Sequence, residues 1–397
     1  RKKAMLIEQG RKFEILQRRY LVDSYINRGL TFVRGEGCYL IDESGEKYLD
    51  LMSNYGVNIF GYNHLYLTQK IAAELPELMT LHGSFNNDLR ALAAQELVSR
   101  CGHGLSRVQF SSSGAEAIEA ALKFAVLATG RKKFLSCGGG FHGKTLGALS
   151  ATYQPKYRMP FEPLLWDFKF IPYNDLDSLE EAADNNVAAF LLEPIQGEGG
   201  INVPAEGYLR EVRRICQQRG VLLILDEIQA GAGRTGSFLA SDEEIEEMDI
   251  LCLGKGLAGG LPFGATLVSR EIAEKIPRSI HTSTFGGNPL ACAGLLATLE
   301  LLNDALFLHV KEIGDYFSGR LRKIKSNLIV EVRGKGLMIG MEFKERRDSI
   351  IKDLQKRKIL AVPAGSSVVR FLPPYIVEKT QIDECVEKLE EVIKSLK

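Results

Sequence analysis

The stretch Val221-Leu-Leu-Ile-Leu-Asp226-Glu-Ile-Gln229 gives the strongest indication of the fold, because five consecutive aliphatic residues end at a carboxylate. A short apolar run of this kind is typical of a strand that is buried on both faces of a parallel sheet. Similar short segments alternate with helical patterns from about residue 85 onward, at residues 108–110, 133–135, 187–192, 250–253 and 265–268. The alternation predicts βα units around a mostly parallel sheet.

The composition indicates a globular protein that binds a small molecule. Of the 397 residues, 45% are hydrophobic and 25% are charged, and fifty basic side chains balance fifty acidic ones. This balance gives no electrostatic reason to expect binding to nucleic acid or to an anionic membrane. The sequence also has no apolar segment long enough for a signal peptide or a membrane span. Seven scattered cysteines without metal-ligand spacing predict reduced thiols in a cytoplasmic protein, with no metal site.

The pattern changes on either side of the alternating region, which predicts two domains. Residues 1 to about 30 are expected to form a charged helix and an extended approach, and residues 38–49 a hairpin that turns at Ser44-Gly45. A long helix (290–302), paired strands (330–343) and a closing helix (381–396) follow the alternating region. We therefore expect an N-terminal segment (1–57) that packs with a small C-terminal domain (291–397), and a large domain (58–290) between them.

Lys255 is expected just past the end of the apolar strand 250–253, with a glycine on each side of it. An amine in this position can form a Schiff base with an aldehyde, and Asp226 at the end of a neighbouring strand can hold a pyridine nitrogen protonated. Together the two residues point to pyridoxal phosphate. The alternative interpretation is a solvated lysine in a Gly-rich turn and an aspartate that caps the next helix.

Two further loops are expected at the same edge of the sheet, because ligands bind at the carboxyl ends of parallel strands. Ser111-Ser-Ser113-Gly114-Ala115-Glu-Ala117 opens a helix and offers free amide groups for a phosphate, although Ser113 can also be a simple N-cap. Gly138-Gly-Gly-Phe141-His142-Gly-Lys144-Thr145 places an aromatic ring among glycines. Phe141 can stack on a pyridine ring or can fill the core.

Charged residues later in the chain indicate recognition of substrate. Glu193 and Glu198 flank a strand end and could serve a metal or an acid/base pair, but no histidine accompanies them. We prefer an ion pair of Glu198 with Arg370, whose apolar surroundings require a partner for its charge; the alternatives are a solvated glutamate and a structural salt bridge. Thr284 is a candidate phosphate donor, from this subunit or from a neighbouring one.

In this order, the motifs resemble those of the class III (ω-amino acid) aminotransferases of fold type I, especially the acetylornithine and ornithine aminotransferase group. The resemblance runs from about Phe32 to the C-terminus and implies a large domain with a seven-stranded, mostly parallel sheet flanked by helices, plus a smaller α+β domain. The motifs are SSGAEA (112–117), GFHGKT (140–145), LEPIQGEGG (192–200), LILDEIQAGAGRTG (223–236), GKGLAGG (254–260), STFGGNPLA (283–291), VRGKGLM (332–338) and VRFLPP (369–374).

The resemblance also implies a role for each matching residue. Lys255 forms the Schiff base, Asp226 binds the pyridine nitrogen, and Thr284 reaches the phosphate across the interface of a homodimer. The residues expected to contact pyridoxal phosphate are Ser113, Gly114, Ala115, Phe141, His142, Asp226, Gln229, Lys255 and Thr284.

For the substrates, the resemblance implies that Arg370 binds the α-carboxylate of glutamate and that Glu198 pairs with Arg370 when no such carboxylate is present. Lys144 departs from the arginine that is usual in F-H-G-R-[ST], and a lysine lacks the planar fork of that arginine. Putrescine-type enzymes share the lysine. Tyr55 can add a hydroxyl to the pocket or can pack in the core.

The expected reaction is a ping-pong transfer of an ω-amino group to 2-oxoglutarate, which gives glutamate and a semialdehyde. Acetylornithine, ornithine or a related compound is the expected donor. The alternatives are a diamine, such as putrescine, and 4-aminobutyrate. A pyridoxal-phosphate-dependent aminomutase or racemase is the alternative from another class, since it would need no oxo acid.

Overall fold

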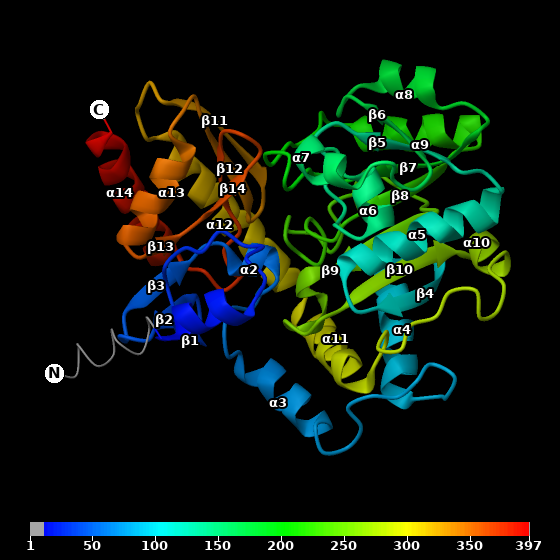
Figure 1. The fold of residues 1–397 in the computed structure, drawn as a ribbon, viewed down its shortest axis with the longest axis horizontal. Helices are drawn as coiled ribbons and strands as arrows, with labels where there is room; N and C mark the ends of the chain where they lie inside the picture. The colour runs from blue at the N-terminus through cyan, green and yellow to red at the C-terminus, as the bar shows by residue number, and fades with distance from the viewer. Residues whose placement is uncertain (1–11, 397) are drawn as a thin grey trace.

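The computed structural model describes residues 12–396, and a seven-stranded sheet lies in its larger part (Figure 1). β10 is antiparallel to both of its neighbours, whereas the other four pairs of adjacent strands are parallel. The prediction of a mostly parallel seven-stranded sheet is therefore confirmed. In order across the sheet, the strands are β4 (Leu105–Ser111), β10 (Gly264–Ser269), β9 (Ile250–Gly254), β8 (Leu222–Asp226), β7 (Val187–Leu192), β5 (Lys133–Cys137) and β6 (Asp167–Ile171).

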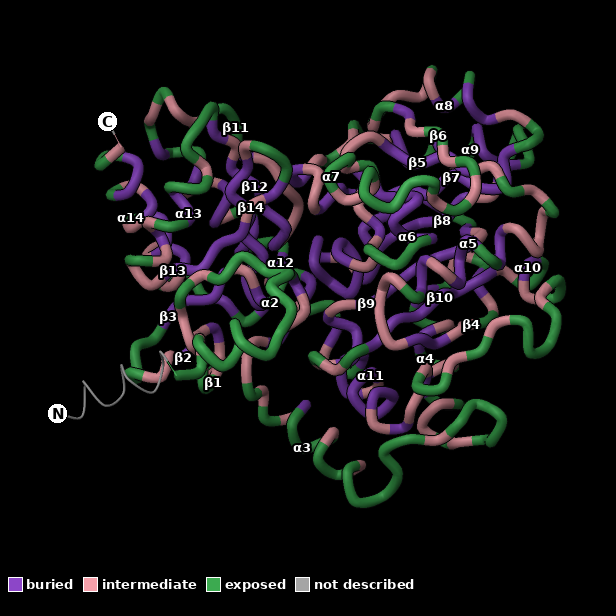
Figure 2. Tube along the Cα trace, in the orientation of Figure 1, coloured by how far each residue is buried: buried purple, intermediate pink, exposed green. Residues whose placement is uncertain are grey.

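Helices cover both faces of this sheet. Because the side chains of a strand alternate between its faces, Leu223 of β8 belongs to one core cluster and Ile224 to another. The cluster of Ile224 includes residues of α5 (Gly114–Thr129), and the cluster of Leu223 includes residues of α9 (Tyr208–Arg219). Figure 2 shows the inner strands of the sheet as mostly buried segments. With both faces covered, the strand ends are the places where a ligand can bind.

Shorter elements complete the larger part of the molecule. They are α3 (Leu65–Glu74), α4 (Asp88–Cys101), α6 (Leu146–Ala151), α7 (Pro155–Arg158), α8 (Leu176–Ala182), α10 (Arg270–Glu274), α11 (Pro289–Leu301) and the 3-10 turns η1 (Met159–Phe161) and η2 (Lys255–Ala258). α11 packs against α3, α4 and η2, so it supports the turn that begins at Lys255.

The smaller part joins the two ends of the chain (Figure 1). β3 (Lys47–Asp50) pairs in parallel with β13 (Ile359–Leu360), and β1 (Phe32–Glu36) and β2 (Tyr39–Asp42) extend this sheet. A second, antiparallel sheet has the order β11 (Ile329–Lys335), β12 (Met338–Phe343), β15 (Val368–Phe371) and β14 (Val362–Ala364). The smaller part also contains the short turn α2 (Ser53–Gly56) and the helices α12 (Asp304–Arg322), α13 (Arg347–Lys356) and α14 (Lys379–Ser395).

The structure contains the expected hairpin β2–β3, the paired strands β11–β12 and the closing helix α14. Residues 12–20 are helical, and the first part of the helix expected there lies outside the described residues. The sequence analysis missed β1, β6 and the short strands β13 and β14. β6 reads Asp-Phe-Lys-Phe-Ile at the edge of the sheet, and its charged residues hide the apolar signal that the inner strands carry.

The domain boundaries at residues 57 and 290 stay a prediction. The pairing of β3 with β13 favours grouping the N-terminal strands with the C-terminal part. Among residues 12–396, no single helix is long and apolar enough to cross a membrane. The pair α11 and α12, bent by 72°, meets the length and composition criteria only when both helices are counted together.

Candidate active site

Lys255 begins η2 directly after the carboxyl end of β9, with its backbone in the left-handed region at φ 48°. The turn is tight, because a Cβ on the next residue, Gly256, would lie 2.5 Å from Cγ2 of Ile59. Burial lowers the pKa of the Lys255 amine, while the charges of Asp226 and Glu198 act in the opposite direction. The amine therefore gains a neutral, nucleophilic form at a lower pH than a surface lysine does.

Asp226 ends β8 and is buried next to a histidine. Its Oδ2 lies 2.7 Å from Nδ1 of His142, and its Oδ1 accepts a hydrogen bond from the amide of Ile228 at 3.0 Å. His142 is buried too, and its own amide donates to Oγ1 of Thr152 at 2.9 Å. The carboxylate is thus held in a fixed orientation. The sequence analysis named His142 as a cofactor residue but missed its contact with Asp226.

Glu193 follows β7 and connects two loops of the site through backbone hydrogen bonds. Its carboxylate accepts from the amide of Phe141 at 2.9 Å and from the amide of Gly197 at 3.0 Å. Burial, together with the nearby charge of Asp226, raises the pKa of Glu193 to about 7, although His142 acts in the opposite direction. Because both of its oxygens bind backbone amides, Glu193 positions the loops. Glu198 binds Arg370 in this structure, as the preferred interpretation of that residue holds.

The N-terminus of α5 contains the three residues predicted to bind phosphate. Ser113 is the N-cap, as the alternative interpretation holds, and its Oγ accepts from the amide of Glu116 at 3.2 Å. Within residues 12–396, the amides of Gly114 and Ala115 have no protein acceptor. A Cβ on Gly254, the residue before Lys255, would lie 3.4 Å from Cα of Gly114. Two free amides at a helix N-terminus therefore lie beside the lysine and suit a phosphate group.

Arg370 lies in β15 with no exposed surface, and its guanidinium group joins several residues of the predicted site. Its Nη2 donates to Glu198 at 2.5 Å and to the carbonyl of Pro363 at 3.2 Å, and its Nη1 donates to Oε1 of Gln229 at 3.0 Å. The Nε of Arg370 has no partner among the described residues. The expected ion pair with Glu198 is present, and the guanidinium keeps one donor available.

Tyr55 lies beside Arg370. Its ring faces the guanidinium of Arg370 at 5.3 Å, and 41% of its surface is exposed, so it does not pack in the core. Its backbone carbonyl accepts from Nε2 of Gln229 at 3.4 Å. Burial raises the pKa of the Tyr55 hydroxyl, and Glu198 raises it further. A neutral phenol thus lies beside the ion pair of Arg370 and Glu198.

Two lysines, Lys144 and Lys156, lie over the ring of Tyr157, which is close enough to Tyr55 to affect the pKa of its hydroxyl. The Nζ atoms of Lys144 and Lys156 lie 4.6 Å and 4.8 Å from the ring centroid of Tyr157. The ring of Phe141, which is half-buried, meets Tyr157 edge to face at 6.2 Å. The sequence analysis missed Lys156 and Tyr157, because nothing in the segment 155–158 indicates that it folds back onto the loop of Phe141.

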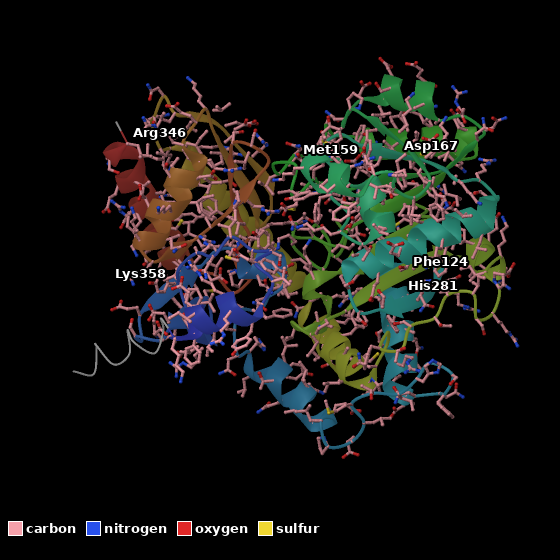
Figure 3. The ribbon with its side chains drawn as sticks, in the orientation of Figure 1. Phe124, Met159, Asp167, His281, Arg346 and Lys358 are labelled. Atoms are coloured by element: carbon pink, nitrogen blue, oxygen red, sulfur yellow. The ribbon has the colours of Figure 1, made fainter. Side chains whose placement is uncertain are left out.

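Thr284 is exposed in the loop between α10 and α11. Part of this loop lies beside α5: the ring of His281 packs edge-on against that of Phe124 at 5.5 Å. Both residues are labelled in Figure 3. Within the described chain, no hydrogen bond joins Thr284 to residues 113–115.

This arrangement defines the class of protein: a fold type I enzyme in which a buried amine works with a phosphorylated carbonyl cofactor. The chain belongs to the class-III aminotransferase family, whose sequence pattern matches residues 23–393. It is 38% identical over 379 residues to an acetylornithine aminotransferase of Methanopyrus kandleri, which covers 95% of this chain and 97% of that protein. It is 40% identical over 390 residues to the [LysW]-aminoadipate semialdehyde transaminase of Deinococcus radiodurans, with coverage of 97% and 91%.

A solved structure of the ornithine aminotransferase from Toxoplasma gondii superimposes with a TM-score of 0.93 at 32% identity, over 97% of this chain and 94% of that one. That structure is described as having partial occupancy of pyridoxal phosphate at its active site. Class-III aminotransferases use this cofactor, so pyridoxal phosphate is the cofactor of the present chain as well. The substrates are accordingly an amino donor and a keto acid.

Proposed function

We propose that this aminotransferase moves an ω-amino group from acetylornithine, or from a close relative that carries a distal carboxylate, to 2-oxoglutarate. The observation that carries the proposal is the ion pair of Arg370 and Glu198, because both charges act on the amine of Lys255. An arginine that can exchange an internal carboxylate for that of a substrate suits a pocket that must accept two unlike molecules in turn. The names of the relatives support this choice of donor.

The residues at the carboxyl edge of the sheet fit pyridoxal phosphate. The free amides of Gly114 and Ala115 suit its phosphate, and the buried carboxylate of Asp226 suits its protonated ring nitrogen. We assign the face of the ring to Phe141, with His142 orienting Asp226, and the neighbourhood of the ring hydroxyl to Gln229. When bound, the cofactor supplies an electron-withdrawing ring that stabilises negative charge on the reacting carbon.

In this proposal Lys255 holds the cofactor and then moves a proton as a neutral amine. The lowered pKa of Lys255 favours that neutral form, which accepts a proton from the reacting carbon of the substrate. Asp226 keeps its orientation, because His142 and the amide of Ile228 hold its two oxygens. Tyr55 covers Arg370 and limits the access of water to the ion pair.

In this proposal Arg370 and Glu198 allow one site to accept the different substrates of the two half-reactions. While the ω-amine donor is bound, Glu198 neutralises Arg370 at 2.5 Å, and no second anion is needed there. When 2-oxoglutarate arrives, its carboxylate takes the place of Glu198 and gains the bidentate geometry that a guanidinium offers. We assign Lys144 and Lys156 to the distal carboxylate of the donor, because their two ammonium groups both lie against the half-buried ring of Tyr157.

We further propose that the enzyme is a cytoplasmic homodimer in which Thr284 completes the phosphate site of the partner. Large apolar side chains are exposed on α3, on the loop after it and next to Thr284, and Figure 2 shows these segments as largely exposed. They are Leu65, Leu75, Leu78, Met79, Phe85 and Phe285. Patches of this kind mark protein interfaces. The seven cysteines are free, which supports a reducing compartment. Sedimentation equilibrium tests the dimer: a mass of 44.0 kDa, that of one chain, would contradict it.

A substrate panel tests the proposed donor. Acetylornithine, ornithine, putrescine, 4-aminobutyrate and lysine are each offered with 2-oxoglutarate, and glutamate is measured. We expect acetylornithine to give the highest kcat/KM and putrescine, which has no carboxylate, a value at least about tenfold lower, as expected for the loss of a charged contact. Lys144→Arg is expected to keep the preference for acetylornithine, whereas Lys144→Ala should reduce it and leave turnover of putrescine unchanged.

Two outcomes of the panel would reject the proposal. If putrescine is the best donor, the diamine alternative is correct, and Lys144 then marks a pocket without a carboxylate. If an amino group moves within one substrate without 2-oxoglutarate, the enzyme is an aminomutase or racemase.

A further inference from the structure

Arg333 lies in the motif VRGKGLM, on β11 of the small antiparallel sheet, and its guanidinium group reaches across to the larger part of the molecule. Its Nε donates to the carbonyls of Gly200 and Ile201, both at 3.1 Å, and its Nη2 donates to the carbonyl of Gly200 at 2.7 Å. Three of its hydrogen bonds therefore end on the loop 197–202, which we call the Glu198 loop.

The other side of the guanidinium is fixed to its own hairpin. Nη1 of Arg333 forms ion pairs with Glu342 at 2.5 Å and with Glu331 at 3.1 Å. The hydrogen bond from Arg333 lowers the pKa of Glu342. Because the two carboxylates anchor the charge, the remaining N–H groups of Arg333 point in one direction, toward the Glu198 loop. The side chain acts as a rigid link between the hairpin and the loop.

A second contact holds the same loop on the same sheet. The amide of Gly365, in the turn between β14 and β15, donates to the carbonyl of Glu198 at 2.7 Å. A Cβ on Gly365 would lie 2.9 Å from the carbonyl oxygen of Gly199, so the two backbones touch. A surface cleft of about 430 Å³, lined in part by Gly199, Arg333 and Gly365, lies beside these contacts.

We propose that Arg333 is a positioning residue that holds the Glu198 loop in the closed position, with Glu198 on Arg370. This inference rests on the proposed exchange of Glu198 for a substrate carboxylate. A carboxylate ligand reaches Arg370 only in molecules whose Glu198 loop is open. The apparent dissociation constant of the ligand is therefore its intrinsic dissociation constant divided by the fraction of molecules with an open loop. Contacts that favour the closed loop therefore weaken binding of 2-oxoglutarate and preserve the site for the ω-amine donor.

The test compares Arg333→Lys, Arg333→Gln, Glu198→Gln and the double variant Arg333→Lys/Glu198→Gln in the holoenzyme. The probe is glutarate, which has two carboxylates and no keto group and therefore binds without reacting; its dissociation constant is measured by calorimetry. We expect glutarate to bind about tenfold more tightly to Glu198→Gln and about threefold more tightly to Arg333→Lys, as a shift of the closed population predicts. The double variant should equal Glu198→Gln, because Arg333 acts through Glu198.

Arg322→Gln is the matched control. Nη2 of Arg322 donates to the carbonyl of Val332 at 3.4 Å, on the same strand as Arg333, without reaching the loop. It should bind glutarate as wild type does. Hydrogen exchange in a peptide that spans residues 197–202 should accelerate in Arg333→Gln and stay unchanged in Arg322→Gln. If Arg333→Gln does not fold, Arg333→Lys carries the test.

The outcomes separate this inference from the proposed function. If Glu198→Gln leaves glutarate binding unchanged, the exchange of carboxylates on Arg370 is wrong, and the inference falls with it. If Glu198→Gln tightens binding but Arg333→Lys behaves like Arg322→Gln, the exchange stands and the role of Arg333 is overturned. An effect of Arg333→Lys that persists fully in the Glu198→Gln background also overturns it, because Arg333 would then act by another route.

Discussion

Burial sets the chemistry of single residues in this site, and Lys255 is the clearest example. Its pKa is lowered first by burial, while Asp226 and Glu198 raise it. A depressed amine pKa means that the neutral form persists to lower pH, and removal of a nearby negative charge lowers the pKa further. Reaction of the apoprotein with pyridoxal phosphate, followed by absorbance, should therefore remain fast below the ordinary range of a lysine. In Glu198→Gln, the pH at which the rate falls by half should be lower still.

The control for this pH profile is Lys255→Ala, which should bind the cofactor without the covalent chromophore. A profile for Glu198→Gln shifted toward higher pH would contradict the assigned electrostatics, because a neutral residue 198 no longer stabilises the ammonium form.

The residue types of this site were predicted from the sequence. Their partners were not: the contact of Asp226 with His142 spans 84 residues and depends on how the loops after β5 and β8 meet.

At the scale of elements, α2 is an unusual turn that places Tyr55. Ser53, Asn54 and Tyr55 have φ values of 46°, 50° and 58°, so three consecutive residues with a Cβ adopt the left-handed region. Such a conformation costs about 1–2 kcal/mol per residue. Asp50 accepts hydrogen bonds from the amides of Met52 and Ser53, at 2.9 Å and 3.2 Å, and the Oγ of Ser53 donates to the carbonyl of Leu372 at 2.6 Å. These contacts keep the strained turn beside Arg370.

Because the backbone at position 55 lies in the left-handed region, we expect glycine there to give a more stable protein than alanine, which reverses the order found in a regular helix. Tyr55→Gly and Tyr55→Ala both remove the ring, but glycine alone relieves the left-handed backbone, so Tyr55→Gly should be more stable than Tyr55→Ala by about 1 kcal/mol. Chemical denaturation measures the difference. At the exposed Glu312 in α12, the order should reverse, with Gly less stable than Ala by about 1 kcal/mol. Equal or lower stability of Tyr55→Gly would show that the turn is not strained.

Elements were predictable from the sequence where one signal dominates. The buried strands β7, β8 and β9 carry uninterrupted apolar runs, and the helix α5 begins at a clear cap. The edge strand β6 was not predicted because one of its faces is partly exposed and charged. The left-handed turn α2 was not predicted either, since Ser-Asn-Tyr has no local preference strong enough to specify it. Its conformation follows from Asp50 and Leu372.

On the scale of the whole molecule, the core encloses every cysteine. All seven are free and buried. Burial raises the pKa of the Cys38, Cys216 and Cys292 thiols to about 12, and it raises those of the other four above their usual range as well. A raised thiol pKa leaves almost no thiolate at pH 8. The folded protein should therefore react with less than about one equivalent of Ellman's reagent at pH 8, and the denatured protein with all seven thiols.

Glu312→Cys supplies the positive control for this experiment, because position 312 is exposed and should add one fast thiol. A native cysteine that reacts as rapidly as this introduced thiol would contradict the burial of the seven thiols. Slow reaction of all seven together would instead measure the opening of the whole core.

The sequence by itself determined the architecture and the chemistry: the apolar runs require a buried parallel sheet, and a lysine and an aspartate at neighbouring strand ends suit one cofactor. The tertiary structure alone decided which charges meet. Arg370 pairs with a residue 172 positions away, and Arg333 binds carbonyls 132 and 133 positions away. The physical reason is that periodicity reports local burial, whereas a buried ion pair depends on the relative placement of two sheets, which no local pattern encodes.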